Sequence, residues 1–82
     1  GLLDAAISYI NLAHMFDGSG KEKDKITDCL FKAYGIISDE SIPHNGYYAF
    51  VIEKCAPSFE YFGYSIIANE LKKLSESIYE RN

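Results

Sequence analysis

Apolar residues recur with a helical period along almost the whole chain, and this pattern constrains the fold more than any other feature. Four stretches carry it: residues 2–16, 23–38, 46–62 and 64–80. Spacings of three and four residues between apolar side chains are typical of amphipathic helices, whereas half-buried strands alternate every second residue. No stretch of this chain shows that alternation. The sequence therefore predicts an all-α fold with four helices.

Turn-forming residues divide the four helices into two pairs. Two glycines in residues 17–20 separate the first helix from the second, and Gly63 separates the third from the fourth. Segment 39–45 is rich in residues that favour turns and forms the linker between the pairs. We expect two antiparallel helical hairpins, over residues 2–38 and 46–81.

Two local features concern the ends of helices. Ser19 and Glu22 have the spacing of a capping box, which predicts the start of the second helix there. Pro57 lies inside the third helical stretch, where its ring clashes with the carbonyl group of Glu53 and it donates no backbone hydrogen bond. The helix either kinks at Pro57 or ends near Cys55 and starts again. We favour the kink.

Composition excludes several functional classes. Apolar residues make up 48% of the 82 positions, which is typical of a globular domain and argues against disorder. The net charge of −4 argues against nucleic-acid binding, which requires a clustered basic face. No apolar run approaches the length of roughly 18 residues that a membrane span needs. Two cysteines without close spacing suggest buried thiols in a reducing compartment, so we expect a cytoplasmic protein.

Small and aromatic residues recur at fixed steps in both hairpins. The first hairpin carries Leu12, Ala13, Phe16, Ile26, Leu30 and Ala33, and the second carries Cys55, Ala56, Phe59, Gly63 and Ala68. This pattern resembles the tetratricopeptide repeat, a helical hairpin of about 34 residues. Ala13 and Ala56 are further apart than one such period, so the resemblance implies an insertion in the linker. Lys72 and Ser75 depart from the family pattern at the later steps of the second hairpin.

The resemblance implies that the two hairpins stack as a segment of a right-handed superhelix. In such solenoids, inner helices bury both faces and the terminal helix has a polar outer face. Here the first helix is apolar on two sides, and the last helix has a charged outer side. Three or more repeats are usually needed for stability. Only two repeats are present here, so we expect the chain to be the C-terminal two repeats of a longer protein, and its start at Gly1 rather than Met fits this expectation.

Tetratricopeptide proteins bind partners in a concave groove lined by the first helix of each repeat. The resemblance places eight residues there: Ile7, Ile10, His14, Asp17, Phe50, Glu53, Glu60 and Tyr61. Members that clamp a C-terminal carboxylate use Lys and Asn, whereas Ile10 and His14 stand at those places here. The apolar and acidic set predicts a partner with basic or aromatic side chains. We expect a non-catalytic protein–protein interaction module that binds a peptide or protein; the alternative is homodimerisation through the first helix.

The residues that could carry catalysis or bind a metal are better explained by helix packing. His14, Cys29, His44 and Cys55 are the conceivable zinc ligands, but their spacings match no compact ligand motif, so we expect no metal. No phosphate-binding loop follows the glycines of residues 17–20, and we expect no cofactor. A thiol enzyme would need Cys55 activated by a histidine, and nothing in the sequence places the two together. We therefore expect no enzymatic activity, and a Cys55-dependent enzyme is the remote alternative.

Overall fold

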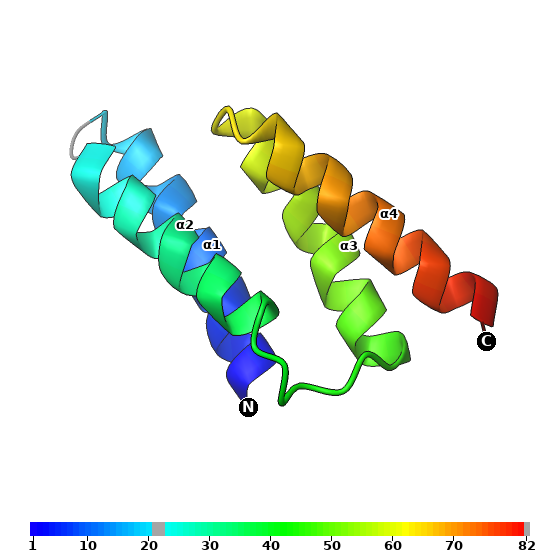
Figure 1. Ribbon diagram of the computed structural model, residues 1–82. Helices are drawn as coiled ribbons and strands as arrows, with labels where there is room; N and C mark the ends of the chain where they lie inside the picture. Colours follow the sequence, from blue (N-terminus) through cyan, green and yellow to red (C-terminus); the bar gives the residue numbers. More distant parts are fainter. Residues whose placement is uncertain (21–22, 82) are drawn as a thin grey trace. The chain divides into compact units, whose positions relative to one another are not determined.

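The computed structural model describes residues 1–20 and 23–81, and these form four α-helices without strands (Figure 1). The helices are α1 (Leu2–Gly18), α2 (Lys23–Ile37), α3 (Gly46–Tyr61) and α4 (Ser65–Arg81). The all-α class predicted from the periodicity is confirmed for the described residues. Both ends of α1, α3 and α4 and the C-terminal end of α2 lie within two residues of their predicted positions, whereas the described part of α2 begins at Lys23, later than the start predicted at Ser19.

The chain divides into two compact units, Gly1–Asp39 and Glu40–Asn82. In the first unit α1 packs along α2, and in the second α3 packs along α4 (Figure 1). Each unit is therefore one helical hairpin, and the two are described separately below.

The core of the first unit combines small residues with larger aliphatic ones. Its buried side chains are Ala6, Ile10 and Ala13 on α1, and Cys29, Leu30, Ala33 and Ile37 on α2. The α1 positions are four and three residues apart, which places them on one face of the helix. Alanines on this face allow the two helix backbones to approach closely.

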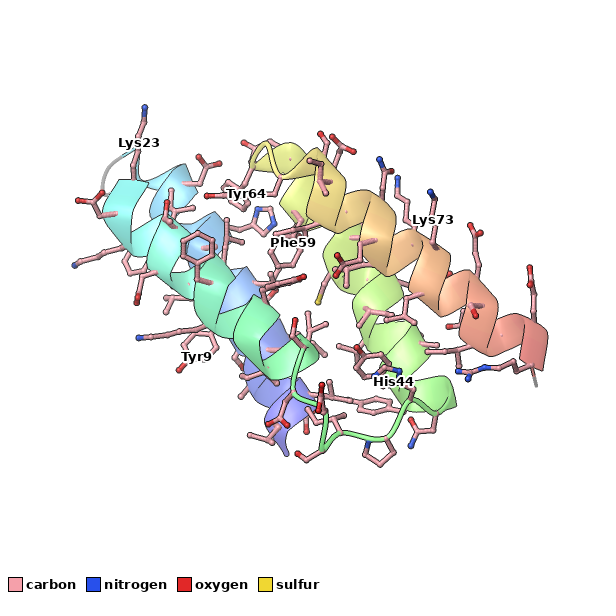
Figure 2. All side chains as sticks on the ribbon, viewed as in Figure 1. Tyr9, Lys23, His44, Phe59, Tyr64 and Lys73 are labelled. Atoms are coloured by element: carbon pink, nitrogen blue, oxygen red, sulfur yellow. The ribbon has the colours of Figure 1, made fainter. Side chains whose placement is uncertain are left out.

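Two lysines of α2 lie over aromatic rings of α1. The Lys25 Nζ atom is 5.4 Å from the ring centroid of Phe16, and the Lys32 Nζ atom is 5.7 Å from that of Tyr9 (Tyr9 is labelled in Figure 2). The aromatic residues are seven positions apart, and the lysines are seven positions apart in the opposite order. These contacts lie two turns apart and follow the register of an antiparallel hairpin.

The end of α1 differs from the prediction. Ser19 is the C-cap of α1, and its hydroxyl group donates a 2.7 Å hydrogen bond to the carbonyl oxygen of Phe16. The predicted capping box pairs Ser19 with Glu22, which lies outside the described residues. Gly20 follows with φ of +72°, a conformation that glycine adopts without steric cost.

The linker orders the start of α3 through three side chains. Asn45 caps the helix, because its Oδ1 atom accepts a 3.0 Å hydrogen bond from the backbone N–H of Tyr48. The ring of His44 stacks on that of Tyr48, with centroids 4.2 Å apart (His44 is labelled in Figure 2). Ile42 is buried although the sequence around it suggests only a solvated turn. The linker is therefore packed at Ile42 and tied to α3 at Asn45.

The core of the second unit comes from one wide side of α3 and one face of α4. The buried residues of α3 are Tyr48, Ala49, Val51, Ile52, Cys55, Ala56 and Phe59, and those of α4 are Ala68, Leu71, Ser75 and Ile78. Ser75 is a polar residue within this core, and its hydroxyl group donates a 2.9 Å hydrogen bond to the carbonyl oxygen of Lys72. This bond satisfies the hydroxyl locally, so a serine fits at a core position.

The end of α3 is defined by Gly63. The helix runs without interruption through Pro57, so the alternative in which it ends near Cys55 is wrong. Gly63 has φ of +93°, and its N–H donates to the carbonyl oxygen of Glu60. The N–H of Tyr64 donates to the carbonyl oxygen of Phe59 across 2.8 Å. These two bonds form a Schellman motif with glycine at its left-handed position.

Candidate functional site

One face of α3 exposes three aromatic side chains. Tyr47, Phe50 and Tyr61 are 50%, 44% and 66% exposed, respectively. Four further exposed residues share this side of the helix: Glu53, Lys54, Pro57 and Glu60. We call these seven residues the α3 face. It lies opposite the buried side of the helix, because its members are separated by the three- and four-residue steps that the core positions also follow.

The aromatic residues of the α3 face contact their neighbours. The rings of Tyr47 and Phe50 stack with centroids 6.5 Å apart, and the Lys54 Nζ atom lies 5.2 Å from the centroid of Phe50. At the other end, Tyr61 meets Phe62 edge to face at 4.9 Å. Phe50 is thus an exposed ring that already holds a cation near it.

The two carboxylates of the α3 face contact hydroxyl groups of α4. The Ser65 hydroxyl group donates a 2.6 Å hydrogen bond to Oε2 of Glu60. Tyr79 of α4 lies near Glu53: burial first, and then the charge of the nearby Glu53, raise the pKa of Tyr79. Glu53 and Glu60 lie seven residues apart, which corresponds to two helical turns, or about 10.5 Å along the axis. Both acidic groups therefore follow the edge of α3 that adjoins α4.

The eight residues predicted to bind a partner fall into two groups. Phe50, Glu53, Glu60 and Tyr61 belong to the second unit, and the structure brings them together on the α3 face. Tyr47, Lys54 and Pro57 join them, although sequence reasoning missed all three. The signal was available, because these residues lie at steps of three, four and seven from Phe50.

The other four predicted residues lie on α1 and do not form a comparable surface. Ile10 is only 5% exposed and belongs to the core of the first unit, so its side chain is not presented to a partner. Ile7 and Asp17 are half-buried, and only His14 is exposed. The predicted α1 contribution is therefore limited to the exposed parts of Ile7, His14 and Asp17.

The two cysteines are free and buried, and their thiols are poorly suited to nucleophilic chemistry. Burial raises the pKa of Cys55 to about 11. Burial and the charge of Asp28 raise the pKa of Cys29, and the charge of Lys32 opposes this. Since the thiolate is the reactive species, a thiol with such a pKa is almost entirely in its unreactive form near neutral pH.

A shallow depression lies beside the turn between α3 and α4. It is lined by Gly63, Tyr64, Ser65, Ile66 and Ile67 and has a volume of about 370 Å³. Ile66 is among the most exposed apolar side chains of the described residues. The depression lies next to the Ser65–Glu60 contact and extends the apolar surface at the end of α3.

In residues 1–20 and 23–81, no three His, Cys, Asp or Glu side chains come together in a group that could hold a metal ion. Over the same part of the chain, no helix combines the length and apolarity required to cross a membrane. Comparison of the chain with protein-family models, with curated proteins and with solved structures finds no match.

Proposed function

We propose that this chain is a non-catalytic protein–protein interaction module that binds a peptide or protein partner through the α3 face. The observation that carries the proposal is the exposure of Tyr47, Phe50 and Tyr61 on one side of a single helix. Aromatic residues dominate the binding energy of protein interfaces, because each buries a large apolar area with few rotatable bonds.

We further propose that the two hairpins are tetratricopeptide-like repeats that stack as a superhelical segment of a longer protein. Support comes from the positions at which the family requires small residues. Ala13, Ala33, Ala56 and Ala68 are all 0% exposed. A larger side chain at any of these sites would separate the packed helices. The α3 face would then line the groove formed by the first helices of the repeats.

We also propose that Cys55 is not catalytic and that the module is cytoplasmic. The protonated state of the buried Cys55 thiol argues against a nucleophile. Two buried, unpaired thiols are also typical of proteins from reducing compartments. The chemistry of the two thiols is the only support for both assignments.

A displayed library of random peptides tests the interaction proposal. Peptides enriched on the unaltered protein are measured against the double variant Phe50→Ala/Tyr61→Ala by fluorescence anisotropy. We expect affinity to fall at least about tenfold, as for hot-spot aromatics. Phe31→Ala is the matched control, because Phe31 is 56% exposed on α2 and lies outside the α3 face. The proposal fails if the double variant folds and binds every selected peptide as tightly as the control does.

A second candidate function, homodimerisation through α1, is favoured by the exposed apolar residues of that helix. Met15 is 70% exposed, and Leu2 and Leu12 are also exposed. Sedimentation at low micromolar concentration separates the two functions. A stable dimer that Met15→Glu converts to a monomer supports dimerisation, whereas a monomer throughout leaves the α3 face as the proposed interface.

A further inference from the structure

We infer that the α3 face binds an extended, arginine-bearing peptide, with one guanidinium group at Phe50 and the neighbouring carboxylate of Glu53, and a second near the carboxylate of Glu60. This inference rests on the proposed interaction function and names the chemistry of the partner. The position of Lys54, the two carboxylates and the distance between them support this partner.

A cation is already present at Phe50. The Lys54 ammonium lies 5.2 Å from the ring centroid, within the distance of about 6 Å at which a cation is attracted to an aromatic face. Phe50 is 44% exposed and stacks on Tyr47, so the pair offers a platform wider than one ring. Lys54 shows that a positive group is accommodated there.

The edge of the α3 face is complementary in charge to a cationic ligand. Glu53 and Glu60 are exposed; Glu60 accepts a hydrogen bond from the Ser65 hydroxyl group of α4, and Glu53 lies near Tyr79 of the same helix. A carboxylate can accept about four hydrogen bonds, so these contacts orient the groups and leave acceptor sites for a ligand. Arginine suits such a surface better than lysine, because its planar group pairs with carboxylates through two hydrogen bonds and also stacks on rings.

The spacing of the two carboxylates suits an extended peptide. Two helical turns separate them by about 10.5 Å along α3. An extended polyproline II peptide has three residues per turn and rises about 9.3 Å over that turn. Arginines three positions apart therefore project from the same side of such a peptide at nearly the required separation, and their flexible stems cover the difference.

Other classes of partner fit the charges of the α3 face less well. An acidic peptide or nucleic acid would meet two exposed carboxylates against one lysine, and like charges disfavour that contact. A second copy of this chain would bring the same acidic edge against itself. A cationic peptide is the partner that both the ring and the carboxylates favour.

The test uses four labelled peptides of proline and glycine with two charged residues or their uncharged replacements. The variable positions carry Arg three apart, Arg two apart, Glu three apart, or uncharged Gln three apart. Fluorescence anisotropy measures binding to the 82-residue chain at low and physiological salt. We expect the peptide with Arg three apart to bind most tightly and to weaken with salt, because exposed charges are screened.

Two double variants with the same change in net charge locate the site. Glu53→Gln/Glu60→Gln preserves size and hydrogen-bonding capacity at the α3 face, and we expect at least about tenfold weaker binding of the Arg peptide. The matched control is Glu76→Gln/Glu80→Gln on exposed positions of α4, for which we expect less than about a twofold change. Circular dichroism confirms that all proteins remain helical.

The outcomes distinguish this inference from the function on which it rests. Equal weakening by both double variants, or equal binding of the Glu and Arg peptides, overturns the arginine assignment. If no Arg peptide binds while library-selected peptides of other composition depend on Phe50 and Tyr61, the interaction function stands and the partner chemistry is wrong. If the selected peptides do not depend on those two aromatics, both proposals are wrong.

Discussion

The Ser65 hydroxyl oxygen lies 2.6 Å from Oε2 of Glu60, so the first residue of α4 holds a carboxylate in the last turn of α3. We predict that Ser65→Ala weakens binding of the peptide with Arg three apart by about two- to fivefold, because Glu60 loses the bond that orients it. The free energy of unfolding should fall by less than about 1 kcal/mol, since the bond is exposed. Anisotropy titrations and urea unfolding measure the two effects.

Ser77→Ala is the matched control for this variant, because Ser77 is an exposed serine on the same helix. Equal affinities of Ser65→Ala and Ser77→Ala would show that the orientation of Glu60 contributes nothing to binding.

Substitution by alanine is expected to change the free energy of unfolding in opposite directions at Gly63 and Gly35. Gly63 has φ of +93°, so Gly63→Ala introduces backbone strain and should lower the free energy of unfolding by about 1 kcal/mol or more. Gly35 lies inside α2, and a Cβ atom there would meet nothing within 4 Å. Gly35→Ala should therefore raise the free energy of unfolding by about 0.5–1 kcal/mol. Urea unfolding of both variants tests this, and a shift of the same sign in both contradicts it.

The sequence predicted the helices well because its glycines lie where the backbone requires them. Gly63 separates two amphipathic patterns and adopts the left-handed conformation in the structure. Ser19 was assigned differently because a serine hydroxyl can cap the end of one helix or the start of the next. Ile42 is buried in a segment whose neighbours all favour turns, and a single apolar residue has no period to reveal its burial.

The candidate site was predictable only in part, because apolar residues line both cores and binding grooves. Ile10 and Phe50 were both predicted to line the groove, yet Ile10 is buried and Phe50 is exposed. Periodicity identifies the face of a helix and does not show what covers that face. The hydroxyl contacts of Glu53 and Glu60 join residues from different helices, and no pattern along one helix indicates them.

Ala56 tests the close packing of α3 in the second unit. It is 0% exposed, so Ala56→Leu adds volume to a filled core and should lower the free energy of unfolding by about 1–3 kcal/mol. Ala5→Leu is the control, since Ala5 is only half-buried on α1, and its effect should be smaller. Denaturant unfolding followed by circular dichroism compares them, and equal stabilities would contradict the packing described for Ala56.

Cys55 should make stability depend on alkaline pH. Burial raises the pKa of its thiol from the ordinary value of 9.0 to about 11 in the folded protein. The unfolded chain therefore loses the thiol proton first, so the stabilisation is complete below pH 9 and is lost as pH rises towards 11. The loss amounts to about 2–3 kcal/mol at the upper end of this range.

Cys55→Ala isolates this contribution, because Tyr79 and Cys29 titrate in both proteins. The difference in unfolding free energy between the two proteins should shrink by that amount as pH rises through this range. A difference independent of pH would mean that Cys55 ionises in the folded protein as readily as in the unfolded chain. Native-state alkylation near neutral pH gives a second measurement, and Cys55 should react much more slowly than in urea.

Lys54 should compete with the arginine peptide for Phe50, which it contacts at 5.2 Å. Lys54→Met keeps the length of the side chain and removes its charge, so we expect binding of the peptide with Arg three apart to tighten by about two- to fivefold, the equivalent of an exposed cation–π contact. Lys73→Met controls for net charge, because Lys73 is exposed on α4 and lies outside the α3 face (labelled in Figure 2). Greater tightening by Lys54→Met than by Lys73→Met locates the guanidinium group at Phe50. Equal tightening assigns the effect to long-range charge, and weaker binding of Lys54→Met means that the lysine itself contacts the peptide.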